Sequence, residues 1–177
     1  MSSSFTPQKL APVRIVVDGY NLLFVSGSMG KVTSANDLAR SRNRVLDLML
    51  EYLPPNLANR TIVVFDAPRH GRSEVAEESK HGDMQVVFAK QHPEADDLIE
   101  EMIRNHPQPR RLTVVSGDQR IRVAARHRRV KDIDSESWWT HLETRHAQAN
   151  RSIEQPESGR EKSEPDDDDT DWLEVFS

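Results

Sequence analysis

The chain has 177 residues, enough for one domain with a hydrophobic core, and it contains no cysteine, which excludes disulfides, thiolate metal sites and a cysteine nucleophile. No stretch is long and apolar enough for a membrane-spanning helix, so we expect no membrane partner and a cytoplasmic location. The net charge is −5, yet residues 151–177 hold 10 of the 29 acidic side chains and only 3 of the 24 basic ones. The part that precedes them is therefore mildly basic.

The two ends of the chain differ in composition from its middle. Residues 1–12 are polar and contain two prolines, so we expect a flexible leader there and a folded domain over 13–149. Residues 150–177, the acidic tail, are rich in Glu, Ser, Pro and Asp and are expected to be disordered. The tail ends in the apolar segment WLEVF, which can be a frayed end, a docking segment or part of an acidic decoy for a basic groove.

Short β-branched runs alternate with segments of helical periodicity. The runs predict buried strands over 13–18, 61–65, 84–89, 112–115 and 130–133. Apolar residues at helical spacing predict helices over 37–52, 94–105, 119–126 and 136–149, the last burying Trp138, Trp139 and Leu142. Residues 67–83 show no period and are expected to form a loop. This alternation predicts an α/β fold, a mostly parallel sheet with helices on both faces.

Acidic side chains occur at the ends of several predicted strands. In an open α/β sheet, ligands bind outside the carboxyl ends of the strands, where the strand order reverses. Carboxylates gathered there repel one another, and a hard divalent cation such as Mg²⁺ or Mn²⁺ removes that repulsion. Such a cation can activate water and stabilise charge on a phosphodiester. The candidate metal ligands are Asp18, Asp66, Asp96, Asp97 and Asp118.

Each of these acids also has a purely structural interpretation. Asp18 and Asp66 can be turn residues. Asp96 or Asp97 can be a favourable charge in the first turn of a helix, and Asp118 can cap the helix that follows it. Because four such coincidences at equivalent strand ends are improbable, the pattern favours a shared site.

Polar neighbours of the acids extend the candidate site. Asn21 can hold a carboxylate, contact a substrate or be a turn residue, and Ser116 can orient a ligand or belong to a β-turn. Asp134 is interpreted as a helix cap rather than as a metal ligand. The candidate catalytic residues are Asp18, Asn21, Asp96 and Asp118.

Arginines supply the expected partner of an acidic metal site. A basic cluster beside the metal would attract a polyanionic backbone, although such arginines can also form an ordinary solvated surface. Aromatic residues are not interleaved with them, which favours backbone contact over sequence readout. The candidate contacts to nucleic acid are Arg44, Arg110, Arg111, Arg120, Arg122 and Arg126.

Four segments, VVDGYNLL, VVFDA, VVFAKQHPEADDLIE and VVSGDQRI, resemble in order and spacing the YacP-like branch of the NYN domain family, which is related to PIN-domain nucleases. The resemblance covers about residues 13–142. It implies a Rossmann-like PIN fold, a three-layer sandwich, and metal-dependent endoribonuclease activity. The family's acidic positions match Asp18, Asp96 and Asp118; Asp66 matches the VFDA motif, Asn21 the DGYN motif, and Asp97 matches less closely.

The sequence features suggest three possible functions for the chain. The leading hypothesis is an endoribonuclease that uses Mg²⁺ or Mn²⁺ to cut RNA in processing or mRNA decay, with the ribosome or other RNA-processing proteins as possible partners of the acidic tail. The second is an RNA-binding adaptor of the same fold with a weak site. The third is a phosphohydrolase for small phosphoesters. An enzyme of the haloacid dehalogenase type would need Asp-x-Asp after the first strand, and this chain has Asp18-Gly19-Tyr20.

Overall fold

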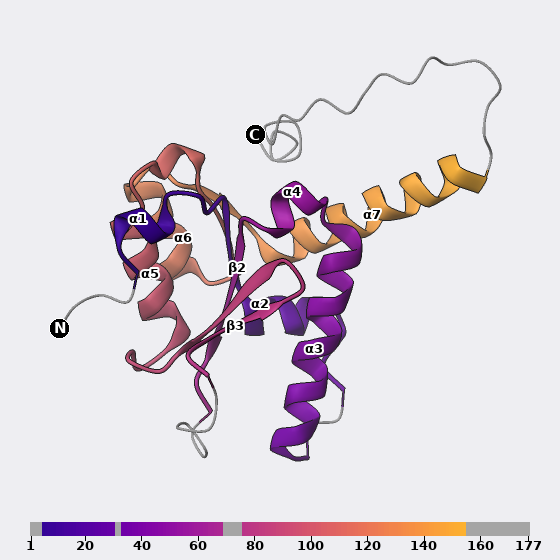
Figure 1. The fold of residues 1–177 in the computed structure, drawn as a ribbon, viewed down its shortest axis with the longest axis horizontal. Helices are drawn as coiled ribbons and strands as arrows, with labels where there is room; N and C mark the ends of the chain where they lie inside the picture. Colours follow the sequence, from indigo (N-terminus) through magenta and orange to yellow (C-terminus); the bar gives the residue numbers. More distant parts are fainter. Residues whose placement is uncertain (1–4, 31–32, 69–75, 155–177) are drawn as a thin grey trace.

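The computed structural model describes residues 5–30, 33–68 and 76–154, and a six-stranded sheet forms its centre (Figure 1). The strand order is β3-β4-β2-β1-β5-β6, and all neighbours run parallel except β3 and β4. The strands are β1 (Ile15–Asp18), β2 (Thr61–Asp66), β3 (Glu78–His81), β4 (Met84–Ala89), β5 (Thr113–Val115) and β6 (Lys131–Ile133). The predicted α/β architecture is confirmed.

Helices cover both faces of the sheet. They are α1 (Pro7–Leu10), α2 (Gly19–Val25), α3 (Ala35–Tyr52), α4 (Pro55–Ala58), α5 (Ala95–Asn105), α6 (Gln119–His127) and α7 (Ser135–Glu154), with a 3₁₀ turn, η1, at Pro109–Arg111. In β1, Ile15 and Val17 join the core formed with α2, α3 and α7, whereas Val16 joins the core formed with α1, α5 and α6. Figure 1 shows α1, α5 and α6 on one side of the sheet and α3, α4 and α7 on the other. The three predicted inward side chains of α7 are buried.

Two local structures differ from the sequence prediction. The Asp-Gly turn expected after β1 is the start of α2, because the Asp18 side chain caps that helix immediately. The loop expected over 67–83 contains β3, which pairs antiparallel with β4 at the edge of the sheet. Its four residues are half-buried or exposed, so β3 lacks the apolar pattern of a strand buried on both faces.

The flexible leader expected over 1–12 is packed from Phe5 onward. Phe5 and Leu10 are fully buried in the core on the α5 side of the sheet. Between them, the Thr6 hydroxyl accepts a hydrogen bond from the Lys9 amide (3.4 Å), and Pro7 opens α1. Two isolated apolar residues among polar ones show no periodicity, so this packing could not be predicted from a pattern.

Helix α7 runs through Glu154, beyond the expected domain boundary at 149 and into the first residues of the acidic tail. Figure 1 shows its far half projecting from the body of the domain. The remainder of the tail, with its WLEVF segment, lies outside the described residues. Within the described ranges, every helix is too short or too polar to cross a membrane.

Candidate active site

Four of the candidate acids meet at the carboxyl ends of the central strands. Asp18 ends β1, Asp66 ends β2, Asp118 follows β5, and Asp96 lies in the first turn of α5. Strand β1 lies between β2 and β5, so the strand order reverses at this point, where α/β sheets bind ligands. The charges of Asp18, Asp66 and Asp118 all act on Asp96. We refer to these four side chains as the acidic cluster.

Asp18 is the most buried member of the cluster, with 7% of its surface exposed. Its Oδ1 accepts a hydrogen bond from the Asn21 amide (3.1 Å), and its Oδ2 accepts one from the Ser116 hydroxyl (3.0 Å). Burial raises the pKa of Asp18, and these two hydrogen bonds oppose that rise. A carboxylate offers about four lone-pair sites, so both oxygens can still accept another ligand.

A short turn after β5 connects Asp118 to Asp18. Asp118 caps α6 by accepting a hydrogen bond from the Arg120 amide (2.6 Å), and its own amide donates to the Ser116 hydroxyl (3.0 Å). Ser116 therefore touches both acids. A Cβ atom at Gly117 would lie 2.7 Å from Asn21 Oδ1, so the Asn21 carboxamide lies against this turn. The candidate roles of Ser116 and Asn21 as site residues are consistent with this geometry.

Asp66 fixes the start of α5. Its Oδ1 accepts a hydrogen bond from the Ala95 amide (2.6 Å), one of the amides at a helix start that lack a partner within the helix. The N-cap residue Glu94 makes no side-chain capping bond, so Asp66 provides this contact from a neighbouring strand. The contact places Asp96, the next residue, at the edge of the cluster.

The ionised form of the Asp96 side chain is disfavoured in this arrangement. Burial, and then the charges of Asp18, Asp118 and Asp66, raise the pKa of Asp96 to about 6, against a smaller opposing effect of Arg120. Without a bound cation, the ionised acidic cluster thus carries negative charge that the surrounding residues do not balance.

Asp96→Asn is expected to stabilise the metal-free protein at pH 7.5. A carboxylate whose pKa rises on folding stabilises the folded state below its unfolded pKa, near 3.9, and loses that contribution as the pH rises to about 6. Asparagine removes the repulsion, so thermal unfolding in EDTA should show a Tm about 2–4 °C higher at pH 7.5 and a smaller gain at pH 5.

Asp97→Asn is the matched control for this measurement, because it removes a charge from the same helical turn, where acids are favourable. It should lower the Tm or leave it unchanged. Equal Tm changes for both variants at pH 7.5 would contradict a repulsive cluster.

The Asp97 side chain is directed to Arg120. The Arg120 guanidinium pairs with Asp97 (2.6 Å) and with Glu100 (2.6 Å), and both pairs raise the pKa of Arg120. The structure therefore places Asp97 in an ion pair beside the acidic cluster, and it holds Arg120 next to that cluster as well.

The donor set fits a hard divalent cation, but the described residues do not present a preformed cage. Oxygen ligands and unbalanced negative charge are what Mg²⁺ and Mn²⁺ require. Yet no three His, Asp or Glu side chains among the described residues lie close enough together, as placed, to hold a metal ion. Asp118 caps α6, as its structural interpretation predicted, and Asp18, which was considered as a turn residue, instead caps α2. Both capping roles are compatible with a ligand role.

Two of the candidate RNA-binding arginines are engaged elsewhere. Arg122 Nε and Arg126 Nη2 pair with Asp132 on β6, at 2.9 and 2.8 Å. This pairing lowers the pKa of Asp132 against the effect of burial. Asp134, by contrast, accepts a hydrogen bond from the Ser137 amide (3.1 Å), which confirms its predicted role as the cap of α7.

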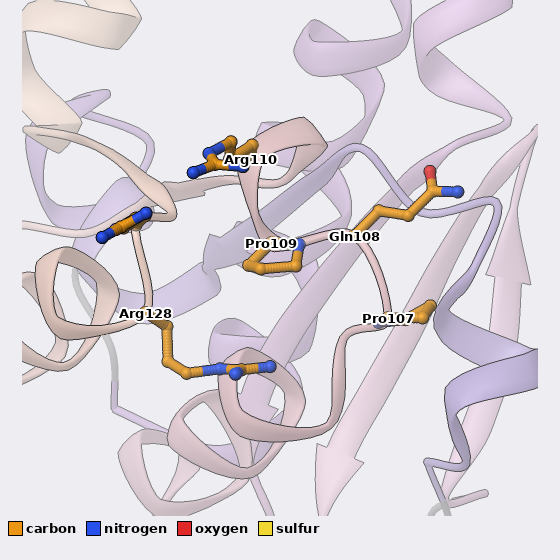
Figure 2. Close-up of a pocket in the computed structure, with 6 residues that line it drawn as sticks. Pro107, Gln108, Pro109, Arg110 and Arg128 are labelled. Atoms are coloured by element: carbon orange, nitrogen blue, oxygen red, sulfur yellow. The ribbon is translucent and has the colours of Figure 1, made fainter.

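Arg110 and Arg111 lie at the opposite edge of the sheet from the acidic cluster. They form η1, which precedes β5, whereas Asp118 follows that strand. A pocket of about 420 Å³ opens there, and Figure 2 shows Arg110 and Arg128 on either side of Pro109. The basic residues are thus divided between two edges instead of forming one cluster. Arg44 is exposed on α3.

Next to the cluster lies a group of aromatic and basic residues that are not among the candidate site residues. Arg42 Nη1 donates to the Tyr20 hydroxyl (3.1 Å), and the Tyr20 ring packs edge-on against Phe65 (5.2 Å between centroids). Tyr20 and Phe65 adjoin the site motifs directly, two residues after Asp18 and one before Asp66. The position of Tyr20 and Phe65 beside these motifs was a signal in the sequence that they belong to the site. Arg42 lies far from the motifs in the chain, and only the tertiary structure brings it to Tyr20.

A mostly parallel sheet whose central strands end in a group of acids is the arrangement expected of a PIN-like nuclease fold. The chain belongs to the YacP-like NYN domain family, whose model matches residues 15–175. This match extends beyond the resemblance over residues 13–142 and through most of the acidic tail.

Solved structures give the same fold. The chain is similar to Rae1 (YacP) from Bacillus subtilis, with a TM-score of 0.55, 23% identity and coverage of 79% of both chains. A tryptophan-to-leucine mutant of that protein gives a TM-score of 0.57 at 23% identity, covering 79% of this chain and 80% of that one. No curated protein sequence matches the chain significantly.

Proposed function

We propose that the protein is a divalent-metal-dependent endoribonuclease that hydrolyses phosphodiester bonds within RNA. The observation that carries this proposal is the acidic cluster at the switch point of an NYN domain, where burial and then the charges of the neighbouring acids raise the pKa of Asp96 to about 6. A protein that used these acids only as helix caps would gain nothing from bringing their charges together.

The residues that would hold the metal are Asp18, Asp96 and Asp118, with Asp66 completing or orienting the set. A bound Mg²⁺ or Mn²⁺ would supply charge stabilisation at the phosphodiester and lower the pKa of water. Because the acids do not form a preformed cage, we expect Asp96, which is less buried than Asp18, to adjust its position when the cation binds.

The chain's own groups would orient this set. The Ser116 hydroxyl holds Asp18 and accepts from the Asp118 amide, so it fixes the separation of two ligands. Outer-shell hydrogen bonds of this kind are a general requirement of metal sites. The Asn21 carboxamide, which lies against the same turn, would donate to a phosphate oxygen or to a carboxylate.

The test is cleavage of a 5′-labelled single-stranded RNA by purified protein with MgCl₂ or MnCl₂. We expect internal fragments that appear with either metal and disappear in excess EDTA. Both metals should also raise the Tm of the wild-type protein, because a ligand that binds only the folded state stabilises it. Cleavage that persists in EDTA, or no cleavage together with no metal-induced Tm shift, would contradict the proposal.

An RNA-binding adaptor with a weak site is the second candidate, favoured by the lack of a preformed cage among the described residues. It predicts RNA binding that persists in EDTA and no cleavage with any metal. We propose a cytoplasmic location and partners in RNA processing under either function. Removal of residues 155–177 is a direct check on the acidic tail. If the tail is a decoy, its removal should tighten RNA binding, whereas removal of a docking segment should leave RNA binding unchanged.

A further inference from the structure

A second cavity, of about 200 Å³, lies between α3 and the sheet on the face that carries Phe65. Its walls include the aromatic rings of Phe65 and Phe88 and the basic side chains of Arg42, Lys80 and His81. We refer to this cavity as the stacking pocket. It is smaller than the pockets that enclose drug-sized ligands, about 300–1,000 Å³, so its size suits one heterocycle.

The stacking pocket adjoins the acidic cluster through the main chain. Phe65 immediately precedes Asp66, and in the sheet it is the register partner of Phe88. A Cβ atom at Gly19, the residue after Asp18, would collide with the Phe65 ring. The Phe65 ring therefore lies against the start of α2, and a group in the pocket would be a near neighbour of a phosphate at the cluster.

The Arg42 guanidinium lies over two largely buried aromatic rings in this pocket. The Phe65 and Phe88 rings stack with centroids 5.8 Å apart at an angle of 29°. Arg42 Cζ lies 5.3 Å from the Phe88 centroid and 5.9 Å from that of Phe65. The Tyr20 hydroxyl accepts a hydrogen bond from Arg42 and so holds the guanidinium in place.

Arg42 differs from the other arginines near the cluster in how it is held. Arg120, Arg122 and Arg126 form ion pairs with carboxylates, whereas among the described residues Arg42 is held by a phenol and two rings. A guanidinium plane that is fixed by a hydroxyl and two rings is a surface on which bases of single-stranded RNA stack.

We propose that the stacking pocket receives one nucleobase of the RNA, adjacent to the phosphodiester held at the acidic cluster, with the base stacked on Arg42. This inference rests on the proposed function and specifies its substrate: an unpaired nucleotide must lie beside the cleaved bond. Double-stranded RNA, whose bases are stacked on one another, is therefore not a substrate.

The test uses single-stranded hexanucleotides that carry 2-aminopurine at one position each and a distal fluorescein, in CaCl₂, with a gel check that the RNA stays intact. Anisotropy reports binding, and 2-aminopurine quenching reports stacking of that base. In the wild type, we expect strong quenching at a single position. Arg42→Lys keeps the charge but removes the planar group, so it should abolish that quenching and weaken binding about fivefold or more.

Arg40→Lys is the matched control, since Arg40 lies on the same helix with its side chain 81% exposed, and it should change neither signal. Tyr20→Phe, which removes only the hydroxyl that holds Arg42, should give an intermediate loss of quenching and guards against misfolding of the Arg42 variant. Binding without position-dependent quenching, or quenching that survives Arg42→Lys, would overturn the pocket and leave the proposed function intact. No anisotropy change with wild-type protein would reject both.

Discussion

Asp18→Asn combined with Asp118→Asn is expected to reduce RNA cleavage by at least about 100-fold. Loss of an outer-shell contact alone typically costs 10- to 100-fold in metal affinity or activity, and this double variant would remove two direct ligands. Asparagine caps helices about as well as aspartate, so α2 and α6 should still begin at the same residues. The measurement is the initial rate of fragment formation with MnCl₂, at equal concentrations of folded protein.

Asp134→Asn is the matched control for the double variant. Asp134 follows β6, so its carboxylate lies at the same edge of the sheet, but it caps α7 and is not among the main causes of the raised pKa of Asp96. This variant should cleave RNA at the wild-type rate. Cleavage that survives in the double variant would remove Asp18 and Asp118 from the site, and equal losses in both variants would point to a general charge effect.

The positions of the acids could be predicted because they depend on topology more than on side-chain detail. Strands that alternate with helices form parallel sheets, and a residue at the end of a parallel strand must lie at the carboxyl edge. Asp18, Asp66 and Asp118 follow this rule, and Asp96 follows from the helix after β4. The same rule could have separated Arg110 from the site, because that residue precedes its strand.

The pairing partners of the arginine side chains could not be predicted in the same way. Arg120, Arg122 and Arg126 occur at helical spacing and resemble an exposed basic face, yet carboxylates from α5 and β6 pair with them. Those partners lie on other elements, so only tertiary packing selects them. The Arg42 contact with Tyr20 depends in the same way on how α3 crosses α2.

Strand β3 and the packed part of the leader could not be predicted for a different physical reason. A strand on an edge is held by main-chain hydrogen bonds and needs no apolar side chains, and β3 has none that are buried. In the leader, burial depends on single residues rather than on a pattern. Periodicity detects amphipathic elements of several turns or a buried run, and neither segment is one.

Phe5→Ala tests whether the leader is part of the folded domain. Phe5 has no exposed surface, packs in the α5-side core, and its carbonyl accepts a hydrogen bond from the Asn105 side chain (3.4 Å). Truncating a fully buried phenylalanine typically costs 3–5 kcal/mol, so we expect about that loss in the free energy of unfolding by urea and a Tm lower by more than about 5 °C. Gln8→Ala, an exposed change within α1, should have little effect.

The same variant separates stability from activity. Helix α1 precedes β1, whereas Asp18 ends that strand, so the Phe5 cavity would open at the opposite edge of the sheet from the acidic cluster. At a temperature where Phe5→Ala is still folded, its cleavage rate per folded molecule should therefore equal that of the wild type. An unchanged Tm would mean that residues 5–12 add nothing to the core, and the domain would then begin at β1.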